Sequence, residues 1–138
     1  MGEFIRDPND WLHRLSPDEW IRAALGELRR AEVAYQKRET RAGAAGVQRA
    51  AGMSLNAALL VEPNESWGRT YLEHVVALAA DTTVPEGVRI ACRSVLDAKV
   101  PSSGVLRLRT PRASERALEG ARDVIAHAWA VVKKNESG

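Results

Sequence analysis

The stretch S114-E-R-A-L-E-G-A-R-D-V-I-A-H-A-W-A-V-V-K-K134 decides the fold of this chain. Its apolar residues recur at spacings of three and four, which places them on one face of a helix. These residues are Leu118, Ala121, Ile125, Ala128 and Val132. We therefore expect a helix over about 114–134 that closes a helical core. The same stretch carries Arg122, Asp123 and His127, the one polar group in the chain with an evident chemistry.

A first helix is predicted over about 17–40. Ser16 and Glu19 match the S-x-x-E capping box, and Pro17 stands at the first helical position, where its missing N–H costs nothing. Charged side chains, Glu27 among them, are expected on the outer face. The inward stripe is Trp20, Ala24, Leu28, Ala31 and Tyr35.

A second helix is predicted over about 42–61, with an apolar face of Ala44, Val47, Ala51, Leu55, Ala58 and Leu59. Its glycines are Gly43, Gly46 and Gly52, and each weakens an isolated helix by about 1 kcal/mol relative to alanine. They indicate either a close approach by another helix, within the chain or in a dimer, or a frayed helix start.

Two shorter helices follow. Ser66 is the expected cap of a helix to about Ala80, and Thr83 with Glu86 matches a second capping box, which opens a helix to about Ala98. The expected inward residues are Leu72, Val75, Val76 and Ala79, then Val88, Ala91, Cys92, Val95 and Leu96. The alternating run 105–109 is interpreted as an extended connector, because a lone short strand has no partner.

Helices joined by short loops, without a credible sheet, predict an all-α fold. We expect an up-down antiparallel bundle of four to five helices over residues 16–134. An N-terminal segment, 1–15, precedes it, and a short tail, 135–138, follows it.

Composition bounds the function only weakly. The single cysteine, Cys92, excludes an intramolecular disulfide and favours a reducing compartment, and no apolar run reaches the length of a membrane span. We therefore expect a cytoplasmic protein with no membrane partner. Residues 107–134 hold seven basic and three acidic residues, a balance of +4, so the rest of the +2 chain sums to −2. This hints at an anionic partner, but sixteen arginines against four lysines also fit a GC-rich bacterial genome, which we favour.

The histidines do not predict a metal site. His13, His74 and His127 lie in separate segments without metal-ligand spacing, so we expect neither a metal nor a cofactor. Cys92 stands on an apolar stripe, where packing is the commoner role. The four tryptophans are interpreted as core and interface anchors.

Two stretches give the chain a family resemblance. D18-E-W-I-R-A-A-L-G-E-L-R-R-A-E-V-A-Y35 followed by G46-V-Q-R-A-A-G-M-S-L-N-A-A-L-L60 resembles the opening helical hairpin of HEPN domains, although Gly52 and Ser54 replace the usual glutamate and lysine. The closing stretch R107-L-R-T-P-R-A-S-E-R-A-L-E-G-A-R-D-V-I-A-H127 resembles the family's arginine-rich connector and final helix. The resemblance implies a HEPN-like helical bundle that forms a homodimer.

Catalytic HEPN domains carry an arginine, four to six residues and then a histidine. Arg122-Asp123-Val124-Ile125-Ala126-His127 matches that pattern, which implies a metal-independent ribonuclease site shared across a homodimer. An imidazole can transfer a proton near neutral pH and a guanidinium can stabilise phosphate charge. The phosphate- or RNA-binding candidates are Arg107, Arg109, Arg112 and Arg116, which otherwise form an exposed basic connector and helix start.

Helix geometry separates the catalytic candidates. Five residues at about 100° each set Arg122 and His127 roughly 140° apart, so one helix does not bring both onto one phosphate. Asp123 and His127 also fit a simple surface pair one turn apart. Two hypotheses follow. One is a bacterial toxin-type ribonuclease acting as a dimer on RNA, and the other is a non-catalytic interaction or nucleotide-binding partner of a separate nucleotidyltransferase chain.

Overall fold

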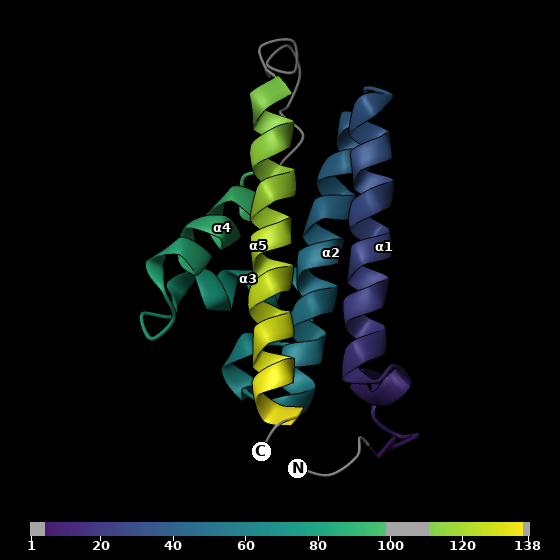
Figure 1. The fold of residues 1–138 in the computed structure, drawn as a ribbon, viewed down its shortest axis with the longest axis vertical. Coiled ribbons are helices and arrows are strands. Elements are labelled where there is room, and N and C mark those ends of the chain that lie inside the picture. The colour runs from purple at the N-terminus through teal and green to yellow at the C-terminus, as the bar shows by residue number, and fades with distance from the viewer. Residues whose placement is uncertain (1–4, 99–110, 137–138) are drawn as a thin grey trace.

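The computed structural model describes residues 5–98 and 111–136, which are mainly helical (Figure 1). The α-helices are α1 (Pro17–Gln36), α2 (Thr40–Val61), α3 (Tyr71–Ala80), α4 (Glu86–Leu96) and α5 (Pro111–Glu136). Two short 3-10 helices, η1 (Trp11–Arg14) and η2 (Glu65–Trp67), precede α1 and α3. The prediction of an all-α helical bundle is confirmed. The expected connector at 105–109 lies outside the described residues, and α5 extends two residues into the expected tail.

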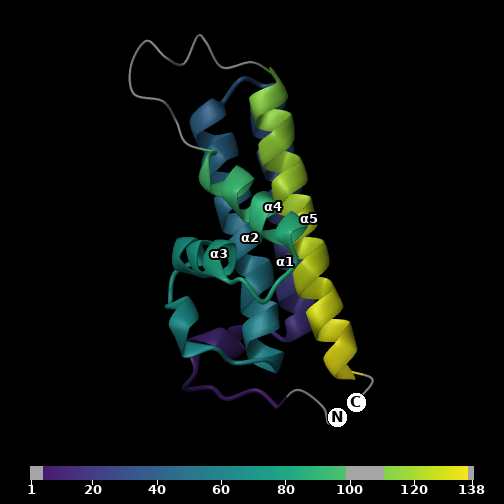
Figure 2. The same cartoon turned by 90° about the vertical axis from the view of Figure 1, so that its left-hand side faces the viewer.

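Three long helices form the body of the bundle, and two short ones lie across it. Figures 1 and 2 show α1, α2 and α5 along the long axis, with α3 and α4 crossing them on one side. Lys133 near the end of α5 lies 3.5 Å from Asp18 near the start of α1, so these helices are antiparallel. Lys134 lies 3.1 Å from Glu62 at the end of α2, so α2 and α5 run in the same direction.

The core is centred on α2, which contacts α1, α3 and α5. All six apolar residues predicted to face inward from this helix are buried. A Cβ added to Gly46 would lie 2.9 Å from the Cβ of Ala31 in α1, and one added to Gly52 would lie 2.1 Å from the Cβ of Tyr71 in α3. The glycines therefore serve close packing within the chain, and they no longer argue for a dimer.

The inward stripe of α5 is confirmed, since all five of its predicted residues are buried. In α4, Ala91, Cys92 and Val95 are buried as predicted. Burial raises the pKa of the Cys92 thiol to about 12, so this thiol packs rather than reacts.

The predicted start of α1 is confirmed. The backbone N–H of Glu19 donates to the Ser16 hydroxyl (3.2 Å), and the Glu19 carboxylate accepts from the backbone N–H of Ser16 (2.8 Å). The helix ends at Gln36, earlier than predicted, because the chain turns at Arg38, whose φ of 62° is left-handed.

The predicted caps of α3 and α4 are wrong. Ser66 belongs to η2, and after Gly68 it is Thr70 that forms a capping box, with Glu73. The N-cap of α4 is Pro85, without a side-chain cap, because the Thr83 hydroxyl donates instead to Asp81 (2.6 Å).

The face of α3 also differs from the prediction. Its buried residues are His74, Val75 and Leu78, whereas Leu72 and Val76 are 46% and 51% exposed. The short helix packs against α2, α4 and η2, and Leu72 and Val76 lie on the side that these elements leave uncovered.

Glu27 also differs from the prediction, because it is buried rather than on the outer face. Its carboxylate accepts from Nε of Arg30 (2.9 Å) and Nε of Arg49 (2.7 Å), and so joins α1 to α2. Burial alone would raise the pKa of this carboxyl, but the two guanidinium groups outweigh it and hold that pKa below its ordinary value. Glu27 is therefore a buried, ionised link between two helices.

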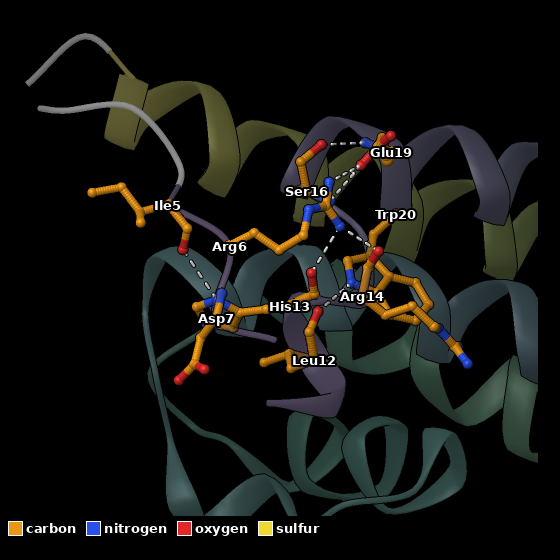
Figure 3. A network of polar contacts seen from close by, with 9 residues as sticks. All are labelled: Ile5, Arg6, Asp7, Leu12, His13, Arg14, Ser16, Glu19 and Trp20. Carbon is orange, nitrogen blue, oxygen red and sulfur yellow. Dashed lines mark hydrogen bonds and ion pairs between the residues drawn. The ribbon is translucent and has the colours of Figure 1, made fainter. Parts of the chain in front are cut away.

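The N-terminal segment is fastened to the start of α1 by Arg6 (Figure 3). The guanidinium donates to the carbonyl oxygens of His13 and Arg14 at the end of η1, and to the Glu19 carboxylate at 3.0 Å. The indole N–H of Trp20 donates to the carbonyl of Leu12 at 2.8 Å. These contacts give η1 a fixed place against the core.

Candidate functional site

The two central catalytic candidates lie on opposite flanks of α5. Arg122 is exposed and donates from Nη2 to the Glu32 carboxylate of α1 at 3.2 Å. His127 is half-buried and faces away from α1, where it lines a cleft with the end of α2. Asp123 is exposed one turn before His127. Within one chain, therefore, Arg122 and His127 do not share a site.

The His127 cleft has a volume of about 440 Å³. It lies between the end of α2, η2, the turn before α4 and the last turns of α5. Its apolar walls are Ala58, Pro63, Trp67, Leu78, Val84, Pro85 and Val131, and its polar residues are Glu62, Asn64, Asp81, Thr83, His127 and Lys134. An apolar concavity with a few polar groups is the usual form of a small binding site.

The carboxylates of the cleft are ionised. Glu62 accepts from the Asn135 amide (2.9 Å) and pairs with Lys134, and these contacts hold the pKa of its carboxyl below the ordinary value. Hydrogen bonds from the hydroxyl and backbone N–H of Thr83 lower the pKa of Asp81 in the same way. Because the charge of Lys134 is already matched by Glu62, the cleft carries excess negative charge.

The His127 imidazole is neutral near pH 7. Burial lowers its pKa, the Glu62 carboxylate opposes that effect, and the Lys134 ammonium adds to it. A neutral imidazole of this kind accepts or donates one hydrogen bond at each nitrogen, according to its tautomer.

The wall of the cleft depends on His74, which sequence reasoning left without a role. His74 is fully buried, with Nδ1 2.9 Å from the Trp67 carbonyl oxygen and Nε2 2.9 Å from the Asn56 side-chain oxygen. Burial lowers the pKa of this imidazole, although its bond to Trp67 and the charge of Glu73 oppose the shift. The Trp67 carbonyl only accepts, so the neutral ring carries its proton on Nδ1.

The neutral tautomer also decides which atom of the Asn56 side-chain amide faces His74. Nε2 of His74 is then an acceptor, and it requires the amide nitrogen rather than the oxygen as its partner. Exchanging the two atoms of the amide supplies that donor, and it gives a partner to the buried Asn56 Nδ2, which otherwise has none. His74 thereby holds the backbone of Trp67, a cleft residue, to α2 and α3. His74 and Leu78 are four residues apart and share the inner face of α3. This spacing is the sequence signal that could have indicated that His74 is buried.

The remaining candidates lie elsewhere. Arg116 is exposed on α5 near its start, Arg112 stands in the first turn of that helix, and Arg107 and Arg109 lie outside the described residues. In the described part of the chain, no three histidine, cysteine or carboxylate residues group as metal ligands would. No helix in these residues is long and apolar enough to cross a membrane.

Comparison with protein-family models, with curated proteins and with solved structures finds no match to this chain. The class that the described residues define is a small all-α bundle with a mixed apolar and acidic cleft beside α5.

Proposed function

We propose that this chain is a non-catalytic HEPN-like interaction module, which binds a segment of a partner protein in the His127 cleft. The divergence of Arg122 and His127 supports this most directly. Cleavage of a phosphodiester needs proton transfer and charge stabilisation at the same phosphate. Arg122 is instead occupied by Glu32 on the other flank of the helix.

The chemistry of the cleft favours a partner segment with apolar side chains and a positive charge. Its walls are apolar, and Glu62 and Asp81 are ionised. A phosphate placed here would meet two carboxylates, and Lys134 is the cleft's one lysine or arginine among the described residues. A nucleotide is therefore the poorer ligand for this cleft. A basic, apolar segment of a nucleotidyltransferase chain would combine the family expectation with this chemistry.

Peptide titration followed by NMR tests the proposal. A short peptide of leucine and arginine should shift the signals of Trp67 and His127, whereas the same peptide with glutamate for arginine, or ATP, should not. Glu62→Gln and Asp81→Asn should each weaken binding about fivefold, the effect of losing one charge pair of about 1 kcal/mol. Glu119→Gln, at an exposed position of α5, is the matched control. Tighter binding of ATP than of the arginine peptide would contradict the proposal.

A second candidate is a metal-independent ribonuclease with Arg122 from one protomer and His127 from the other. The neutral His127 imidazole favours it, because a general base must be unprotonated. Purified protein should then cut RNA with EDTA present, and His127→Ala and Arg122→Ala should each lower the rate roughly a hundredfold or more. Arg93→Ala, exposed on α4, should leave the rate unchanged. Cleavage that survives both substitutions comes from elsewhere, and absence of cleavage leaves the interaction module.

We also propose that the protein is a homodimer, as the HEPN resemblance implies. Exposed apolar side chains on α1 and α5, Leu25 and Trp129, support this part of the proposal.

A further inference from the structure

The surface between α1 and α5 is built from two matching helical stripes. On α1, Asp18, Leu25 and Glu32 follow each other at seven-residue intervals, close to two helical turns, and so share one side. On α5 the corresponding stripe is Arg122, Ala126, Trp129 and Lys133, at intervals of four, three and four. We call these seven residues the α1–α5 face. Both helices stand at the front of the view in Figure 1.

Two ion pairs bound an apolar centre on this face. Arg122 pairs with Glu32 at 3.2 Å towards one end. Towards the other, Lys133 lies 3.5 Å from Asp18 and also pairs with Glu136 of its own helix at 2.9 Å. Between them Leu25 is 46% exposed and Trp129 is 49% exposed. The Lys133 ammonium lies 5.5 Å from the centre of the Trp129 ring. An apolar centre within a charged rim is the usual anatomy of a protein interface.

The charges of the face are complementary to those of a second copy. The four charged residues of the face are Asp18 and Glu32 on α1 and Arg122 and Lys133 on α5, and each acid stands level with its base because the two are paired within the chain. Glu136, the second partner of Lys133, lies outside the face near the end of α5. A twofold axis lying in the interface and parallel to the helices preserves these levels. It sets α1 of one copy over α5 of the other, so Glu32 meets Arg122 and Asp18 meets Lys133 across the interface. Arg22 and Arg29 lie about 40° further round α1, at the edge.

We propose that the α1–α5 face is the contact surface of the homodimer, with a second copy of this chain docked about a twofold axis parallel to α1 and α5. This surface rests on the homodimer of the proposed function. It removes Leu25 and Trp129 from water and keeps every rim charge opposite its counter-charge. His127 stays on the outer flank of α5, so both clefts remain open and no joint Arg122–His127 site forms.

Charge exchange between two variants tests this surface. One variant carries Arg122→Glu and Lys133→Glu, so that its rim is wholly acidic, and the other carries Asp18→Lys and Glu32→Lys, so that its rim is wholly basic. Sedimentation at about 100 µM, where a micromolar dimer is saturated, should give twice the monomer mass for the wild type. Each variant alone should be monomeric, and an equimolar mixture should recover the doubled mass. Circular dichroism checks that both variants fold.

Single substitutions give a second measurement that does not depend on charge. Trp129→Ser should raise the dissociation constant of the dimer at least tenfold. Leu72→Ser is the control, because Leu72 on α3 is about as exposed as Trp129 but lies outside the face, and it should leave that constant unchanged. If both charge variants dimerise like the wild type, another surface holds the dimer and this inference is wrong. A monomeric wild type removes the homodimer as well. In both cases peptide binding in the His127 cleft is unaffected, so that proposal stands or falls separately.

Discussion

At the scale of single residues, the buried His74 should make the stability of the fold depend on pH. His74 has no exposed surface, and its nitrogens lie 2.9 Å from the Trp67 carbonyl oxygen and from the Asn56 side-chain amide, whose exchanged orientation suits the neutral ring. A second proton would turn Nε2 from acceptor to donor and would place a charge in the core. Proton uptake is therefore easier in the unfolded chain than in the folded one.

The free energy of unfolding should consequently fall as the solution is acidified. Burial depresses the folded pKa of His74 below its ordinary value of 6.5, so this stability is complete above 6.5 and is lost as the pH falls towards the folded pKa. Burial of His127 acts in the same direction. Urea unfolding between about pH 7.5 and 5.5, above the range in which carboxylates titrate, measures the slope.

The variant His74→Asn separates the two histidines. Its amide nitrogen keeps a donor near the Trp67 carbonyl but does not titrate, so the pH slope should shrink while some stability is lost. A slope equal to that of the wild type would show that His74 is not the source. The double substitution with His127→Ala should remove most of what remains.

At the scale of helices, the sequence predicts what is local and strongly periodic. The stripe of α5 and the capping box at Ser16 depend on residues within a few turns of each other, and both are as predicted. Glu27 was misplaced because its burial depends on Arg49, which is 22 positions away in another helix. The face of α3 was misplaced because η2 takes up residues that had been assigned to its first turn.

Alanine substitutions at two helical glycines, Gly52 and Gly26, should change the free energy of unfolding in opposite directions. A Cβ at position 52 would lie 2.1 Å from Cβ and 2.5 Å from Cα of Tyr71, so Gly52→Ala must push α3 away from α2 and should cost about 1–3 kcal/mol. Nothing lies within 4 Å of a Cβ at position 26 in α1. Gly26→Ala should therefore stabilise the protein by roughly 0.5–1 kcal/mol, because alanine loses less backbone freedom in a helix.

Urea unfolding of both variants measures these changes, with circular dichroism as a check on helix content. A destabilising Gly26→Ala would mean that its side of α1 is covered, and a neutral Gly52→Ala would mean that α3 is loosely held.

At the scale of the whole molecule, the candidate site was predictable only in part. The separation of Arg122 from His127 follows from the turn of one helix and is seen in the structure. The cleft around His127 was not predictable, because Glu62, Asp81 and Lys134 come from three segments far apart in the chain. Their meeting depends on α3 and α4 lying across the long helices rather than beside them.

The burial of Cys92 has a practical consequence. It is the chain's one thiol, it is fully buried in α4, and its pKa of about 12 leaves almost no thiolate at neutral pH. A thiol reagent can therefore modify the native protein only during a transient opening of the bundle. The labelling rate, divided by that of the urea-unfolded chain, should give the population of open molecules directly. Labelling of Cys92 thus reports how often the bundle opens. Gly52→Ala should raise the labelling rate, and Gly26→Ala should lower it.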